Sequence, residues 1–163
     1  VMDTWYTNGT EVVFACGGGI YTSAVDAAKK VEGAKVIGVD VDQAGVIANY
    51  AAGEDADQAT IDGYKALTVT SAMKGLTDGV QWGLAYVFEG SFADIAGKST
   101  TLSAKENAVG LPTATWSLKN FTVEQYQAEL AKIVNGEITV DNNFEMSNPE
   151  KAELSNVKVN FVD

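Results

Sequence analysis

The sequence predicts an α/β protein in which a mainly parallel sheet forms the middle of a three-layer sandwich. Two short apolar runs, residues 11–16 and 35–40, have the composition of strands that are covered on both faces. Between them, three glycines precede apolar residues at helical spacing, and Gly33 follows where that helix would end. A strand, a tight turn, a helix and a second strand in this order indicate a right-handed βαβ unit.

The next part of the chain predicts a loop, a strand and a helix. Residues 41–65 contain three glycines and a charged run, which indicate a long loop with one short helix at 46–51. A third strand is expected at 66–70, because this run is rich in β-branched residues. A helix is expected at 77–89, where apolar residues recur on one face.

Two further strands are expected in the second half of the chain. Residues 99–103 are the candidate for the fourth strand, and residues 157–162 for the last one. Glycine and proline at 110–112 mark a break, and residues 141–155 have the polar composition of a loop.

The clearest helix signal lies at residues 120–135. Thr122 and Gln125 have the spacing of a capping box, and Gly136 follows the last apolar residue. Residues 1–8 have the pattern of the end of a helix and no basic start of a signal peptide, so we expect the chain to be a fragment.

The composition excludes several classes of function. The 163 residues include 22 acids, 11 lysines and no histidine, for a net charge of −11. An acidic surface repels a phosphate backbone, so nucleic acid is not an expected partner. The absence of histidine removes the commonest general base and the commonest zinc ligand. Cys16 is the single cysteine, and we expect it to be a small buried residue rather than a nucleophile.

The glycine turn is the first candidate for a binding site. Gly17, Gly18 and Gly19 join a strand to a helix, and such a turn directs backbone N–H groups towards a ligand above it. A tight turn without a ligand is the alternative. Tyr21 follows the turn and is the candidate for stacking on a flat ring, although packing in the core is an equal possibility.

Polar residues at two strand ends complete the candidate site. Asp40 and Asp42 follow the second strand, and a carboxylate there accepts charge-assisted hydrogen bonds from the vicinal hydroxyls of a sugar. Gln43 has the same location and a weaker signal, and Lys74 follows the third strand. The alternative for each is a solvated polar residue. We find no catalytic set, because no base is present to activate a serine.

Dinucleotide binding by an oxidoreductase is a rival hypothesis. An acid about 21 residues after the last glycine is where a nicotinamide-binding fold holds the ribose. However, Thr22 occupies the place of the third glycine of the G-x-G-x-x-G pattern, so the match is incomplete.

Four segments in order, EVVFACGGGIYTSAVDAAKK, VIGVDVDQ, TVTSAMKG and KENAVGL, resemble the basic membrane protein family of bacterial substrate-binding lipoproteins. These proteins are similar to purine nucleoside receptors of ABC importers. The resemblance covers essentially the whole chain but only the second half of a family member. It implies a type I periplasmic-binding-protein fold, in which two lobes close on a ligand. The segment at residues 41–66 is longer than the family pattern and could lie over the cleft, so the expected ligand is a nucleoside-like molecule rather than a purine nucleoside in particular. A simple sugar is the alternative ligand.

The resemblance also implies a division of the chain and a setting for it. Residues 1–70 would belong to the second lobe, residues 71–111 would cross the hinge and pack on the absent first lobe, and residues 112–163 would return. Asp40 would bind ribose hydroxyls, with Lys74 at the hinge crossing. The full receptor would be a non-enzymatic, cofactor-free lipoprotein outside the cell membrane, with an ABC permease as its partner. In isolation, the fragment would self-associate or pair with the missing lobe.

Overall fold

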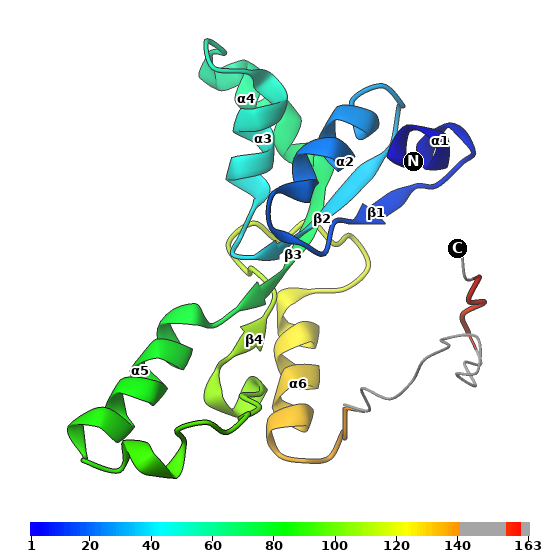
Figure 1. Ribbon diagram of the computed structural model, residues 1–163. Coiled ribbons are helices and arrows are strands. Elements are labelled where there is room, and N and C mark those ends of the chain that lie inside the picture. The colour runs from blue at the N-terminus through cyan, green and yellow to red at the C-terminus, as the bar shows by residue number, and fades with distance from the viewer. Residues whose placement is uncertain (141–155, 161–163) are drawn as a thin grey trace.

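The computed structural model of the chain describes residues 1–140 and 156–160 (Figure 1). The polar loop expected at 141–155 lies outside these residues. The described part of the expected last strand, residues 157–160, forms no strand, and the rest of it also lies outside.

A four-stranded sheet confirms the α/β class. Strands β1 (Val12–Phe14), β2 (Lys35–Asp40) and β3 (Thr68–Lys74) are parallel and adjacent in chain order. Strand β4 (Val109–Gly110) is antiparallel and pairs only with the last two residues of β3. The mainly parallel sheet with its helices is consistent with a three-layer α/β lobe.

Small side chains allow the helices to lie close to the sheet. Helix α2 (Tyr21–Ala28) connects β1 to β2 and buries three alanines and Val25. Helix α1 (Met2–Thr7), the expected end of a helix, packs on α2, and the Tyr6 hydroxyl donates to the Lys35 carbonyl at 2.7 Å. Val36 and Ile47 are fully buried between these elements, so the core lies on this side of the sheet.

The short helix expected at residues 46–51 is confirmed and is longer than predicted, but the rest of the long loop expected at residues 41–65 is wrong, because a second helix forms there. Helix α3 (Ala44–Ala52) packs its alanines and Ile47 into the core. Helix α4 (Gln58–Tyr64) begins at Asp57, whose carboxylate accepts the Thr60 N–H at 2.9 Å. Apolar burial by α3 and a good N-cap on α4 outweigh the weak helix propensity of the glycines.

The fourth strand is also not where the sequence predicts it. Residues 99–103 form no strand, and pairing with β3 begins at Val109. Ser103 instead caps a 3₁₀ turn at Ala104–Glu106, in a capping box with Glu106. Asn107 then adopts a left-handed conformation with φ of 56°, which turns the chain into β4.

The remaining helices extend away from the α1–α4 side of the sheet, beyond the end of β3 (Figure 1). Helix α5 (Leu76–Phe88) follows β3 directly, and helix α6 (Val123–Val134) begins at Thr122 with the expected capping box. Within the described residues, no helix combines the length and the apolar character that crossing a bilayer requires.

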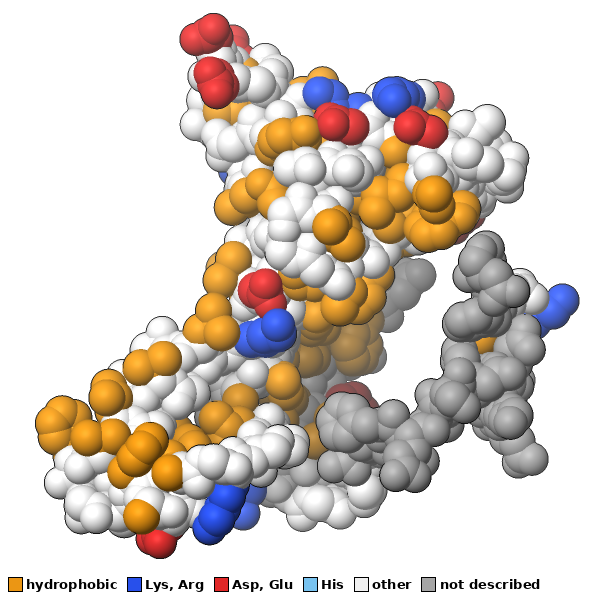
Figure 2. Space-filling view, viewed as in Figure 1, with side chains coloured by type: hydrophobic (Ala, Val, Ile, Leu, Met, Phe, Trp, Pro, Cys, Tyr) orange, Lys and Arg blue, Asp and Glu red, His pale blue; other side chains and the backbone are white. Residues whose placement is uncertain are grey.

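Helix α5 exposes an apolar face (Figure 2). Leu76, Val80, Leu84, Val87 and Phe88 are all at least 45% exposed, and Phe88 is 85% exposed. A helix with this composition is normally buried against another element.

Candidate ligand-binding site

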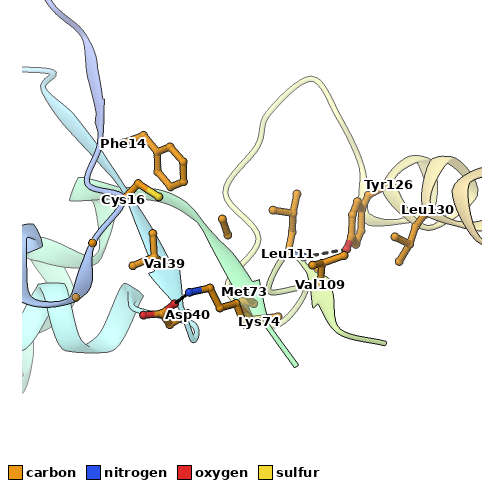
Figure 3. Close-up of a pocket in the computed structure, with 14 residues that line it drawn as sticks. Phe14, Cys16, Val39, Asp40, Met73, Lys74, Val109, Leu111, Tyr126 and Leu130 are labelled. Carbon is orange, nitrogen blue, oxygen red and sulfur yellow. Dashed lines mark hydrogen bonds and ion pairs between the residues drawn. The ribbon is translucent and has the colours of Figure 1, made fainter. Parts of the chain in front are cut away.

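A cavity of about 460 Å³ lies at the carboxyl ends of β1, β2 and β3, where open parallel sheets bind ligands. One wall comes from this sheet edge and the glycine turn, and the opposite wall from β4 and α6 (Figure 3). Its lining residues are Phe14, Cys16, Gly17, Gly18, Val39, Asp40, Ala72, Met73, Lys74, Val109, Gly110, Leu111, Tyr126 and Leu130.

Asp40 and Lys74 are the two charged residues of this lining, and they form an ion pair. The Lys74 Nζ lies 2.7 Å from the Asp40 Oδ1 (Figure 3). They come together because each stands at the carboxyl end of a strand and the two strands are parallel neighbours. The hydrogen bond and the charge of Asp40 raise the pKa of Lys74 above its ordinary value, so the amine is cationic at neutral pH.

The backbone at Asp40 is in the left-handed region, with φ of 69°. Aspartate and asparagine tolerate this region better than other residues with a side chain. The conformation ends β2 and directs the chain into α3. A residue in a sparsely populated conformation at a cavity wall is a common feature of binding sites.

The glycine turn contributes two of its three residues to the cavity wall. Gly17 and Gly18 line the cavity, whereas Gly19 does not. Gly18 has φ of 38°, a conformation that favours glycine. An added Cβ at Gly18 or Gly19 would meet no atom within 4 Å, so the space above the turn is open to a ligand.

Asp42 lies beside the cavity rather than in it. Its carboxylate accepts the Ala44 N–H at 3.1 Å and the Thr115 hydroxyl at 2.7 Å. It lines an adjoining hollow of about 430 Å³ that shares Asp40 and Lys74 with the cavity. Asp42 therefore helps to hold the loop after β4 against the end of the sheet.

Gln43 is buried and has a structural role. Its side-chain oxygen accepts the Val39 N–H at 2.9 Å, and its backbone N–H donates to the Ser71 hydroxyl at 3.0 Å. A Cβ on Gly38 would lie 2.8 Å from both Gln43 and Ser71, so glycine is required for this close packing. The structure does not place Gln43 at the cavity.

Tyr21 also lies outside the cavity. Its ring packs edge-on against Tyr50, with centroids 5.9 Å apart. The aromatic rings that line the cavity are instead Phe14 of β1 and Tyr126 of α6. Phe14 could have been found from the sequence, because it lies near the end of the strand that leads into the glycine turn. Nothing in the local sequence connects Tyr126 with that turn.

The lining combines an apolar interior with one polar end. Aliphatic, aromatic and sulfur-containing side chains form most of the wall, and Asp40 and Lys74 supply a carboxylate and an amine. Cys16 is exposed at the cavity and not buried as the sequence suggests. Among the described residues, no three histidine, cysteine or acidic side chains are grouped to hold a metal ion.

No family model and no curated protein matches the chain. The geometry of the cavity is therefore the basis on which its function is inferred.

Proposed function

We propose that this chain is the ligand-binding lobe of an extracytoplasmic receptor that delivers a nucleoside-like molecule to an ABC importer. The observation that carries the proposal is the cavity at the sheet edge, which joins an apolar, aromatic interior to the Asp40–Lys74 pair. Such a cavity suits a ligand with a flat ring at one end and hydroxyl groups at the other. The resemblance to the nucleoside-receptor family supports the same assignment.

The ion pair explains how the polar end would bind a sugar. Asp40 accepts hydrogen bonds from two vicinal hydroxyls, and Lys74 donates to a hydroxyl or ether oxygen. Both charges remain partly exposed, at 37% for Asp40 and 66% for Lys74. Because both groups are partly exposed, hydroxyl groups can bond to them while the ion pair stays in place.

In this proposal, ligand binding is coupled to transport by closure of two lobes. The exposed apolar face of α5 is the surface that would pack on the first lobe in the full receptor. In the isolated chain, the same face would pack on a second copy. The lipid anchor and the permease belong to the full receptor. In this proposal the protein binds the ligand and does not change it chemically.

The test is a titration of the 163-residue chain with adenosine, guanosine, uridine, ribose and reduced nicotinamide dinucleotide. Backbone amide NMR detects weak binding and reports whether Gly17, Gly18 and Asp40 move. We expect binding of at least one nucleoside with shifts at these residues. Binding of the dinucleotide alone would favour the oxidoreductase, binding of ribose alone a sugar receptor, and no binding would refute the proposal.

A matched pair of variants tests the role of Asp40. Asp40→Asn keeps the left-handed backbone and removes the charge, whereas Asp94→Asn removes an acid from an exposed site outside the cavity. Loss of a hydrogen bond to a charged group weakens binding by about 1.5–3 kcal/mol. We expect that loss with Asp40→Asn and none with Asp94→Asn; equal affinities would remove Asp40 from the site.

A further inference from the structure

Tyr126 both lines the cavity and bonds to the neighbouring part of its wall. Its ring lines the cavity, and its phenol oxygen accepts the Leu111 N–H at 2.9 Å (Figure 3). An added Cβ on Gly110 would lie 3.2 Å from the same oxygen, so glycine allows the phenol to approach β4. One side chain on α6 thus contacts Gly110 and Leu111, which belong to the same wall.

The Tyr126 ring is supported by a second aromatic side chain. The Trp116 ring lies 5.4 Å from it between centroids, at an interplanar angle of 36°. Trp116 is itself held by its indole N–H, which donates to the Phe121 carbonyl at 2.8 Å. A ring with contacts on one side and a hydrogen bond at its tip has little freedom to rotate, and a fixed ring loses less entropy when it binds a ligand.

We propose that Tyr126, one of the two aromatic residues that line the cavity, positions and contacts the flat ring of the ligand, because Trp116 supports its ring and its phenol oxygen holds the neighbouring wall at Leu111. The inference deepens the proposed function and depends on it. It moves the aromatic contact from Tyr21, where the sequence suggests it, to a helix that begins more than a hundred residues later. The ligand class is a nucleobase or an aromatic ring of similar size that carries a sugar.

The experiment compares two ligands and three variants by titration, with adenosine and ribose as the probes. Tyr126→Leu removes the ring and the hydroxyl, Tyr126→Phe removes the hydroxyl alone, and Tyr86→Phe is the matched control on α5, away from the cavity. Stacking of a base on an aromatic ring contributes roughly fivefold to a hundredfold in affinity. We expect that loss for adenosine with Tyr126→Leu, and no change for ribose.

Tyr126→Phe separates the two parts of the role. The ring remains but the Leu111 N–H loses its acceptor, so we expect adenosine affinity to fall about twofold to tenfold and the Leu111 amide resonance to shift. Tyr86→Phe should bind both probes as the wild type does. Far-UV circular dichroism and urea unfolding establish that each variant is folded. If Tyr126→Leu does not fold, Tyr126→Phe still tests the positioning role, and an unchanged adenosine affinity in that variant would overturn the inference.

Each outcome either supports the inference or overturns it. Selective loss of adenosine binding supports it, whereas equal losses for adenosine and ribose indicate a structural role and overturn it. Wild-type affinity in the folded Tyr126 variants also overturns it but leaves the proposed function intact, since the wild type then still binds adenosine. A wild-type chain that binds no nucleoside overturns both.

Discussion

Replacing Gly75 by alanine should destabilise the protein strongly, because the backbone at Asn107 and Ala108 lies close against it. Gly75 follows β3, and its N–H donates to the Ala108 carbonyl at 2.9 Å. An added Cβ would clash with the Asn107 carbonyl oxygen and lie 2.9 Å from the Ala108 Cα. These atoms are backbone, so no change of rotamer can relieve the clash.

The magnitude follows from overpacking and a weakened hydrogen bond. Overpacking a tight site costs about 1–3 kcal/mol, and loss of the Gly75–Ala108 hydrogen bond costs about 0.5–1.5 kcal/mol more. We expect the free energy of unfolding to fall by about 1.5–4.5 kcal/mol when both effects operate in full. The backbone at Gly75 has φ of −73°, so the effect is steric and not torsional.

The assay is urea unfolding followed by circular dichroism, with Gly83→Ala as the matched control. Gly83 lies inside α5, where an added Cβ meets no atom within 4 Å, so the same substitution should stabilise the helix by about 0.4–1 kcal/mol. Opposite signs for the two variants are the expected result. A Gly75→Ala variant as stable as the wild type would refute the close approach of Gly75 to the backbone of Asn107 and Ala108.

Four further predictions concern stability and ligand choice. Thr122→Ala should lower the free energy of unfolding by about 1 kcal/mol through loss of the α6 capping box, with Thr122→Ser near wild type in the same urea assay. Ile47→Val should lower it by about 0.5–1.5 kcal/mol, since Ile47 is fully buried. The Thr60 hydroxyl and N–H bonds hold the pKa of Asp57 below its ordinary value, so its stabilisation is present above about pH 4 and is lost as the pH falls through the lowered pKa. Asp57→Asn, measured by urea unfolding between pH 5 and pH 2, should keep the cap and show a weaker dependence on pH. Adenosine monophosphate should bind more weakly than adenosine in the NMR titration, because the net charge is −11.

The unit of β1, α2 and β2 could be predicted because its signals are local. The bounds of β2 agree with the sequence prediction, since a buried apolar run ends at an acid. Asp40 and Lys74 could be expected near each other, because the ends of adjacent parallel strands share one edge. The order of the strands was not deducible from their composition.

The rest depended on tertiary packing. Gly45 and Gly63 suggested a loop, yet both lie inside helices, where burial of Ile47 and the cap at Asp57 decide the structure. The part of the cavity wall on α6 could not be predicted from the sequence for another reason. The pattern around Tyr126 is that of any amphipathic helix, and nothing in it shows that Tyr126 contacts Leu111 or that it lines the same cavity as the glycine turn.

The ion pair sets which ligands the cavity favours. In the free protein, Asp40 and Lys74 neutralise each other, so the lining has no net charge. An anionic ligand is attracted by Lys74 but repelled by the carboxylate of Asp40. A cationic ligand is attracted by Asp40 but repelled by Lys74. A neutral ligand with hydroxyl donors and oxygen acceptors can bond to both groups without separating their charges. For the proposed function, the same geometry would favour a nucleoside over its phosphorylated form, and the acidic surface would add repulsion of anions at longer range.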